Sequence, residues 1–291
     1  MITILTSPKA FRGHIGVIQL NAITSWTRLV PRPQVILLGN DEGTAEVARR
    51  LAVEHCPDVA CSESGAPLVN DLLEKGQQLA TYPLVCLINA DIILTRDFCS
   101  SIQRLSLKGF LLVGQRWDLD VEGSINFDSD SWEANLRARL RSKARLHAKS
   151  GIDYFVFPCG FFQDVPPFAI GRTTWDNWLV YKARFLGVPV VDATTEITAI
   201  HQNHELPYAG GRAARSGWKE AQQNRQLVSA NEHLFTLEDC NYVLTEQGPK
   251  KRTWTRHRMQ RELDMLAVLR PRYSTWFAFC KRLTFFLPQK S

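Results

Sequence analysis

Along the first hundred residues, short unbroken apolar runs alternate with segments whose apolar positions recur at helical spacing. An unbroken apolar run of four to eight residues is typical of a strand that is buried on both faces. The predicted strands are residues 2–8, 34–40 and 84–88, and the predicted helices are residues 15–29, 44–56 and 69–82. This alternation favours an α/β fold, with a mostly parallel sheet flanked by helices.

After residue 100 the alternation is looser, but the same two patterns continue. We predict strands at 110–120 and 153–162, helices at 130–150 and 171–187, and one or two strands within 188–205. The chain has no internal repeat and no low-complexity segment.

The strand at 84–88 ends in the polar sequence Asn89-Ala90-Asp91 before apolar residues resume. A carboxylate at the end of a buried strand is costly unless a partner or a ligand satisfies it. Ligands of parallel sheets lie beyond the carboxyl ends of the strands, so we expect three such ends to face one crevice. They are residues 6–8, 39–42 and 89–91.

Two familiar nucleotide-binding motifs are missing from the sequence. The first predicted strand is not followed by G-x-G-x-x-G, which disfavours a dinucleotide site, and there is no P-loop motif. The seven cysteines are odd in number and form no C-x-x-C pair, so we expect free thiols in a reducing cytosol rather than a structural zinc site.

Composition is ordinary for a globular protein, with 45% hydrophobic and 22% charged residues in a chain of 291. No apolar run approaches the roughly 20 residues that span a bilayer, and the first residues lack the pattern of a secretory signal. Residues 250–291 hold eleven Lys and Arg against two acids, a net charge of +9, while residues 1–249 carry −3. We therefore divide the chain into a main domain, 1–249, and a basic C-terminal helical extension, 250–291.

Four features in order resemble the GT-A-type glycosyltransferases over roughly residues 1–230. The stretches that carry the resemblance are "INADIIL", "DYFVFPCGFF", "WDNWLVYKA" and "IHQNHE". The resemblance implies a GT-A-like fold and transfer of a sugar from a nucleoside diphosphate donor, preferably a UDP-sugar, to a hydroxyl acceptor. The alternatives are a sugar nucleotidyltransferase, or a nucleotide-sugar-binding protein without catalysis.

The same resemblance implies a Mn²⁺ or Mg²⁺ cofactor held by Asp91 and His201. A hard cation neutralises the two charges of a diphosphate and improves it as a leaving group. The family often has Asp where this chain has Asn89. Asp91 could instead cap the following segment, and His201 could be a core histidine with His204 as the ligand.

Asp176 resembles the acidic residue that deprotonates the acceptor hydroxyl in inverting members of the family. Burial that raises its pKa would suit this role. The alternative is an acid that interacts with the helix dipole at a helix start. The neighbouring Trp175 and Trp178 either stack on a sugar or fill the core.

The remaining donor contacts implied by the resemblance come from strand ends and loops. The full predicted donor site consists of Thr6, Pro8, Asp41, Glu42, Asn89, Asp91, Arg116, Gly160, Tyr208, Gly210 and Gly211. Arg116 would bind phosphate or hold Asp118 or Asp120. The Tyr208–Gly211 segment would close over the diphosphate or form a turn.

The end of the chain mixes aromatic and basic residues, a composition that suits a membrane surface and equally a solvated basic helix. We expect a cytoplasmic protein, in which 270–291 either make a peripheral contact with the inner face of the membrane or belong to a basic helix packed on the domain. The main domain is slightly acidic and has no nucleic-acid-binding module, so we expect no nucleic-acid partner.

Overall fold

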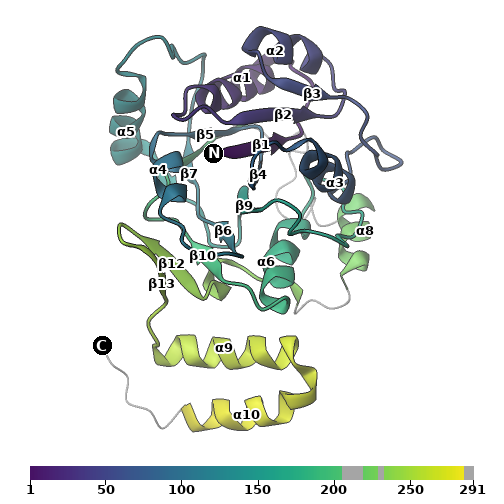
Figure 1. The fold of residues 1–291 in the computed structure, drawn as a ribbon, viewed down its shortest axis with the longest axis vertical. Helices are drawn as coiled ribbons and strands as arrows, with labels where there is room; N and C mark the ends of the chain where they lie inside the picture. Colours follow the sequence, from purple (N-terminus) through teal and green to yellow (C-terminus); the bar gives the residue numbers. More distant parts are fainter. Residues whose placement is uncertain (205–218, 229–232, 285–291) are drawn as a thin grey trace.

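The structure, a computed structural model, describes residues 1–204, 219–228 and 233–284. Its centre is a nine-stranded sheet with the order β13-β12-β10-β6-β9-β4-β1-β2-β3 (Figure 1). The strands are β1 (Ile2–Thr6), β2 (Gln34–Leu38), β3 (Glu54–Cys56), β4 (Leu84–Ile88), β6 (Leu111–Val113), β9 (Tyr154–Pro158), β10 (Val190–Asp192), β12 (Tyr242–Thr245) and β13 (Gly248–Lys251).

Helices cover both faces of this sheet (Figure 1). Residues of α1, α2 and α4 belong to one buried cluster, and residues of α3, α6 and α9 belong to the other. The helix bounds are α1 (Gly13–Thr27), α2 (Thr44–Leu51), α3 (Val69–Leu79), α4 (Asp97–Gln103), α5 (Trp132–Lys143), α6 (Trp175–Phe185), α8 (Lys219–Leu227), α9 (Arg256–Leu269) and α10 (Ser274–Leu283). The predicted α/β architecture is confirmed.

Strand β4 shows why its sequence is apolar throughout. Val85 and Leu87 point into the cluster on one face, and Cys86 and Ile88 point into the cluster on the other. Such two-sided burial follows from the period of two along a strand. Its neighbour β1 is parallel to it, but its other neighbour β9 is antiparallel. The remaining pairs of this sheet are parallel except β6–β9 and β12–β13, so the sheet is mostly parallel, with β9 reversed near its centre and β13 reversed at its edge.

A second, four-stranded sheet has the order β5-β11-β7-β8. Its strands are β5 (Ile92–Leu94), β7 (Trp117–Leu119), β8 (Arg145–Leu146) and β11 (Ala199–Gln202). In this sheet His201 is paired with Ile92 on one side and with Asp118 on the other. The register thus brings three distant segments together next to Asp91.

Three predicted elements differ from the structure. The helix expected at 44–56 ends at Leu51, because Ala52 adopts a left-handed conformation with φ of 49°, and 54–56 form strand β3. The strand expected at 110–120 is two strands, β6 and β7, which lie in different sheets. The helix expected at 130–150 ends at Lys143, and β8 follows.

Beyond β13 the chain forms a helical hairpin of α9, the 3-10 helix η3 (Pro271–Tyr273) and α10 (Figure 1). Met265 and Leu269 of α9 belong to the buried cluster that also contains residues of α3 and α6, and Arg184 of α6 donates a hydrogen bond to Glu262 of α9. The boundary that we expected after residue 249 falls inside β13, and the division into two units stays a prediction. Within the described ranges, no helix is long and apolar enough to cross a membrane.

Candidate functional site

A pocket of about 340 Å³ opens where β1, β2 and β4 end. Residues 7–9 follow β1, residues 89–91 follow β4, and Asp41 lies three residues after the end of β2, as expected for the carboxyl edge of a parallel sheet. The polar side chains that line the pocket are Ser7, Lys9, Gln19, Asp41, Ser64, Asn89, Asp91, Arg172 and His204.

Asp91, His201 and His204 form a candidate metal centre at this pocket. One ligand atom from each residue lies within 4.8 Å of the others. The Oδ2 atom of Asp91 is 3.2 Å from Nε2 of His204 and 3.6 Å from Nε2 of His201. Its Oδ1 atom is buried and has no hydrogen-bond partner. A carboxylate with an unused oxygen beside two imidazoles fits a divalent cation such as Mn²⁺.

The charges around Asp91 keep it ionised. Burial opposes ionisation, but the hydrogen bond with His204 and the charges of His201 and Arg116 outweigh it, lowering the pKa of Asp91 to about 2. The alternative of a capping role for Asp91 finds no support in the described hydrogen bonds, because its carboxylate faces imidazoles instead of backbone N–H groups.

Asp118 lies behind the metal centre and was not predicted as a site residue. Its carboxylate is 3.3 Å from Nδ1 of His201, 2.6 Å from Nδ1 of His147 and 3.0 Å from Nε of Arg116. Burial opposes its ionisation, but His201, His147 and Arg116 together hold the pKa of Asp118 well below its usual range. A carboxylate behind a ligating imidazole fixes the orientation of the ring.

Asp153 joins the end of β4 to this network. Its Oδ1 atom accepts a hydrogen bond of 2.7 Å from the Asn89 side chain and one of 2.6 Å from Arg116. Its Oδ2 atom is buried without a partner. These contacts explain why Asn serves at position 89, since an amide donates to Asp153 where a second carboxylate would repel it.

Asp176 lies in the first turn of α6. Burial is the main cause that raises the pKa of Asp176 to about 7, and the charge of Asp153 adds to it. Its Oδ1 atom is buried and has no hydrogen-bond partner. The ring of the preceding Trp175 lies 5.4 Å from that of Phe155, which pairs with Leu87 near the carboxyl end of β4. Asp176 therefore lies towards the same edge of the sheet as Asp91.

Side-chain hydrogen bonds fix the start of α6. Asn177 donates to the carbonyl oxygens of Ser150, at 3.2 Å, and Phe235, at 2.8 Å. The preceding Thr174 has a φ of 101°, a conformation that costs a non-glycine residue about 1–3 kcal/mol. Such strain persists only where the surrounding structure determines the backbone.

Four of the predicted donor residues line the pocket, namely Pro8, Asp41, Asn89 and Asp91. Three others lie close by without lining it: Thr6 is fully buried, Glu42 forms an exposed ion pair with Arg12, and Arg116 holds Asp118 and Asp153. The predicted Tyr208, Gly210 and Gly211 lie outside the described residues.

Gly160 lies elsewhere. It follows β9, which runs antiparallel to β4 and pairs its end, Pro158, with Leu84 at the start of β4. Gly160 therefore lies at the amino end of β4, the opposite edge from Asn89, and its backbone N–H donates to Gln77. The resemblance implied that Gly160 contacts the donor, and the antiparallel direction of β9, which the sequence does not reveal, places it at the opposite edge.

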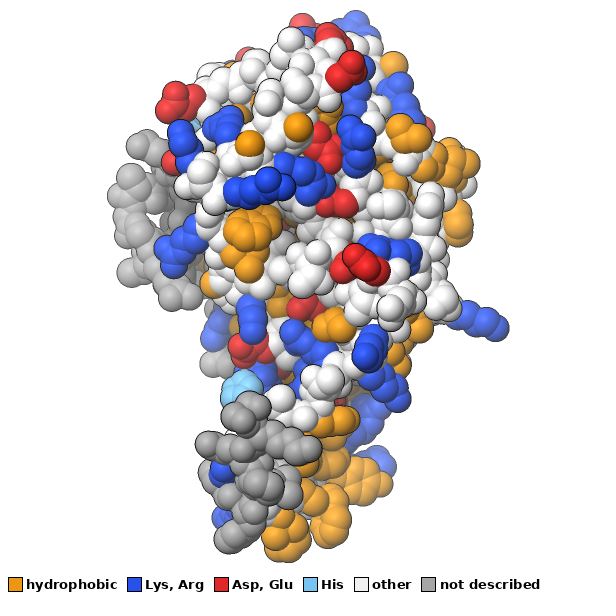
Figure 2. Space-filling model, turned by 90° about the vertical axis from the view of Figure 1, so that its left-hand side faces the viewer, with side chains coloured by type: hydrophobic (Ala, Val, Ile, Leu, Met, Phe, Trp, Pro, Cys, Tyr) orange, Lys and Arg blue, Asp and Glu red, His pale blue; other side chains and the backbone are white. Residues whose placement is uncertain are grey.

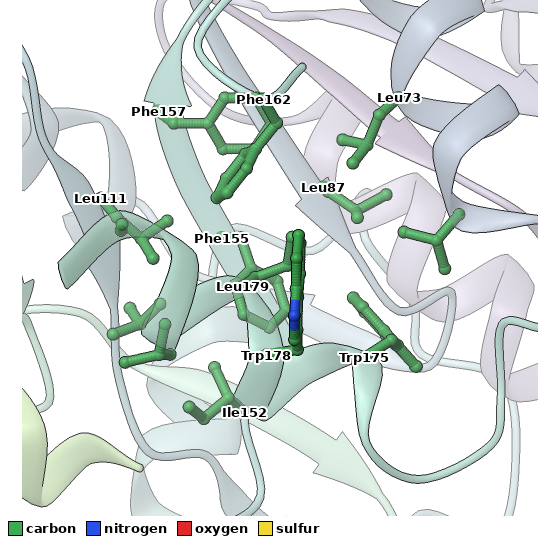
Figure 3. Close-up of a cluster of buried hydrophobic side chains, with 14 of the residues drawn as sticks. Leu73, Leu87, Leu111, Ile152, Phe155, Phe157, Phe162, Trp175, Trp178 and Leu179 are labelled. Carbon is green, nitrogen blue, oxygen red and sulfur yellow. The ribbon is translucent and has the colours of Figure 1, made fainter. Parts of the chain in front are cut away.

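Trp175 and Trp178 are core residues. They are 4% and 7% exposed and belong to the cluster that packs against the central sheet. The ring of Trp178 lies 5.4 Å from that of Phe168. The ring of Trp175 lies 5.4 Å from that of Phe155, and Figure 3 shows these two side chains in the buried cluster. The two tryptophans therefore anchor α6 in the core and do not stack on a sugar.

Sequence reasoning also missed Arg172, which lines the pocket and pairs with Glu220 of α8. Glu220 in turn accepts hydrogen bonds from Ser62 and Ser64, so α8 is tied to the loop before α3. The signal was present, because Arg172 lies four residues before Asp176, in the segment that leads into α6. Its partner Glu220 is 48 residues away and could not be inferred.

No family model and no curated protein matches the chain. Among solved structures, TarS 1–349 of S. aureus in complex with UDP-GlcNAc is 11% identical with a TM-score of 0.50, covering 94% of this chain and 72% of that one. The mannosyltransferase PcManGT from Pyrobaculum calidifontis, in complex with GDP-Man and Mn²⁺, is 14% identical with a TM-score of 0.46, covering 74% of this chain.

This chain spans only 60% of the length of that mannosyltransferase. A third similar structure is glucosyl-3-phosphoglycerate synthase from Mycobacterium tuberculosis in complex with Mn²⁺, UDP and phosphoglyceric acid, which is 15% identical with a TM-score of 0.41, covering 70% of this chain and 72% of that one. At these identities the likeness to TarS shows the fold. The GT-A-like fold that we predicted is confirmed.

Proposed function

We propose that this protein is a glycosyltransferase that moves a sugar from a nucleoside diphosphate donor to a hydroxyl acceptor. The observation that carries the proposal is the convergence of the Asp91–His201–His204 centre and Asp176 at one edge of a GT-A-like sheet. Asp91 has the charge to hold a cation, and Asp176 has the pKa of a base that works near neutral pH.

Donor binding belongs to the pocket at the ends of β1, β2 and β4. Asp91, His201 and His204 would hold Mn²⁺ or Mg²⁺, which neutralises a diphosphate and makes it a better leaving group. Lys9 and Arg172 also line the pocket and supply positive charge for phosphate oxygens. We favour a UDP-sugar, the donor class that the TarS structure contains.

Transfer would begin when Asp176 accepts the proton of the acceptor hydroxyl. The acceptor oxygen then forms a bond to the anomeric carbon of the sugar, and the bond from that carbon to the diphosphate oxygen breaks. Displacement in one step from the face opposite the leaving group inverts the configuration. The raised pKa of Asp176 suits a group that must take up a proton in this step and release it afterwards.

The test measures donor binding and sugar transfer separately. A panel of nucleotide sugars is screened for thermal stabilisation with and without Mn²⁺, and stabilisation by one donor only with Mn²⁺ is expected. The Asp176→Asn variant should bind that donor as the wild type does and hydrolyse or transfer its sugar at least ~10²-fold more slowly. If no nucleotide sugar binds in either condition, the proposal is wrong.

Product analysis separates the sugar nucleotidyltransferase alternative. A glycosyltransferase releases a nucleoside diphosphate from its donor, whereas a nucleotidyltransferase releases pyrophosphate from a nucleoside triphosphate. A binding protein without catalysis would release neither. The cytoplasm and the inner face of the membrane stay predicted locations.

A further inference from the structure

The C-terminal hairpin exposes more large apolar side chains than its length would suggest. Eleven large hydrophobic residues are exposed in the described part of the chain, and five of them lie between residues 254 and 283. These five, which we call the aromatic patch, are Trp254, Tyr273, Trp276, Phe279 and Leu283. Scattered exposed apolar residues are normal, but a gathered set marks an interaction site.

Four residues of the aromatic patch, Trp254, Trp276, Phe279 and Leu283, are neighbours. Trp276, Phe279 and Leu283 follow helical spacing on one side of α10, and the rings of Trp276 and Phe279 are 6.0 Å apart. Leu283 and Trp254 both line an open groove between α9 and α10. The other side chains lining this groove are Met259, Glu262, Leu263, Leu266, Cys280 and Thr284.

Helix α10 contributes nothing to the interior of the main domain. None of its residues is buried, and it packs on α9 (Figure 1). Trp276 keeps 62% of its surface exposed, and Trp254 keeps 66%. Figure 2 shows hydrophobic side chains gathered at the end of the molecule that the hairpin forms. A basic helix that is only solvated has no need of exposed aromatic side chains, so these residues of α10 need another explanation.

Positive charge surrounds the aromatic patch. Residues 250–284 hold ten Lys and Arg and only two acids. Both acids have partners within the protein, since Glu262 accepts from Arg184 and Asp264 pairs with Lys281 at 2.6 Å. Arg272 and Arg282 are exposed beside the patch.

We propose that the hairpin binds the surface of a lipid bilayer that carries anionic headgroups. Trp276, Phe279 and Leu283 would enter the boundary between headgroups and acyl chains, while Arg272 and Arg282 bind phosphates. The ten residues of α10 are too few to span a bilayer, so the helix lies in the plane of the surface. This contact is independent of the proposed sugar transfer.

The charge pattern favours lipid over a second copy of the chain. A symmetric dimer through the aromatic patch would place two basic rims against each other, because the same surface is used by both partners. Like charges brought together oppose such a contact. An anionic bilayer instead offers apolar and negatively charged partners at the same time.

The experiment is co-sedimentation of the full chain with vesicles of phosphatidylcholine alone or mixed with phosphatidylglycerol. We expect binding to the mixed vesicles that weakens as salt is raised. The Trp276→Ser/Phe279→Ser variant should weaken it by at least about tenfold. The matched control is Phe185→Ser, which removes an aromatic ring that is 45% exposed on α6 and should bind as the wild type does.

A second pair of variants tests the contribution of charge separately from that of the apolar contact. Arg272→Gln/Arg282→Gln should lose most of the preference for phosphatidylglycerol, whereas Arg49→Gln/Arg50→Gln, two exposed arginines on α2, should keep it. Sedimentation equal to wild type in the Trp276→Ser/Phe279→Ser variant overturns the proposal. So does absence of binding by the wild type, or a dimer in solution that the same variant dissociates.

Discussion

The raised pKa of Asp176 makes a prediction that needs no substrate. In the folded protein the pKa is about 7, against an ordinary value of 3.8. Because the folded value is the higher one, the protonated carboxyl stabilises the fold fully below about pH 4, and this contribution is lost as the pH rises through about 7. Replacing Asp176 with Asn removes the titration while it keeps the shape of the side chain.

The magnitude follows from the two pKa values. Relative to wild type, Asp176→Asn should gain about 1.5 kcal/mol of stability from this source at pH 5 and about 4 kcal/mol at pH 8.5. Part of the side chain reaches solvent, so these values are upper limits. The new side chain can also change the stability by an amount that is the same at every pH. This amount cancels when the gain in stability at pH 5 is subtracted from the gain at pH 8.5.

The assay is urea unfolding followed by tryptophan fluorescence at both pH values, in metal-free buffer. The control is Asp130→Asn, an exposed acid before α5, whose effect should be the same at both pH values. If Asp176→Asn also shows an effect that is independent of pH, the carboxyl titrates normally in the folded state. The argument that burial prepares it to act as a base would then be refuted.

Three further predictions concern the metal centre and the core. Asp91→Ala should abolish Mn²⁺-dependent binding of UDP in calorimetric titration, while circular dichroism stays unchanged; full affinity in the variant would exclude Asp91 as a ligand. Burial opposes a charged His201, but Asp118 and Asp91 raise the pKa of His201. The affinity for Mn²⁺ should therefore fall as the pH drops and His201 takes up a proton. An affinity that does not change with pH would contradict a role of His201 as a ligand. Trp178→Ala should lower the free energy of unfolding by about 3–5 kcal/mol, measured in urea, and a loss below about 1 kcal/mol would argue against its core role.

The sequence was sufficient to predict the layered α/β fold, because its strands are apolar on both faces and its helices have a clear period. The resemblance also named Asp91 and His201 as neighbours, and the structure brings the two side chains together, while their role as metal ligands stays a prediction. Gly160 was misplaced since the direction of a strand leaves no trace in its residues. Antiparallel pairing of β9 with β4 is a property of the assembled sheet.

The polar network behind the metal centre was equally out of reach. Asp118, His147 and Asp153 approach one another because the register of the small sheet and the entry to β9 bring them there. A single Asp or His in a sequence gives no indication of such partners. The exposure of the aromatic patch could not be predicted either. The sequence pattern of an aromatic helix is the same whether its side chains pack against the protein or face solvent.

The reversed strand β9 has a consequence for how the chain reaches its fold during synthesis. β9 is made after β1, β2, β4 and β6, yet it lies between β4 and β6. Until residues 154–158 leave the ribosome, one edge of β4 has no strand to pair with, and this edge belongs to an apolar strand. Nascent chains in which residues 154–158 have not yet left the ribosome should therefore aggregate or recruit chaperones. A ribosome that pauses before this point would prolong the exposure of the edge of β4.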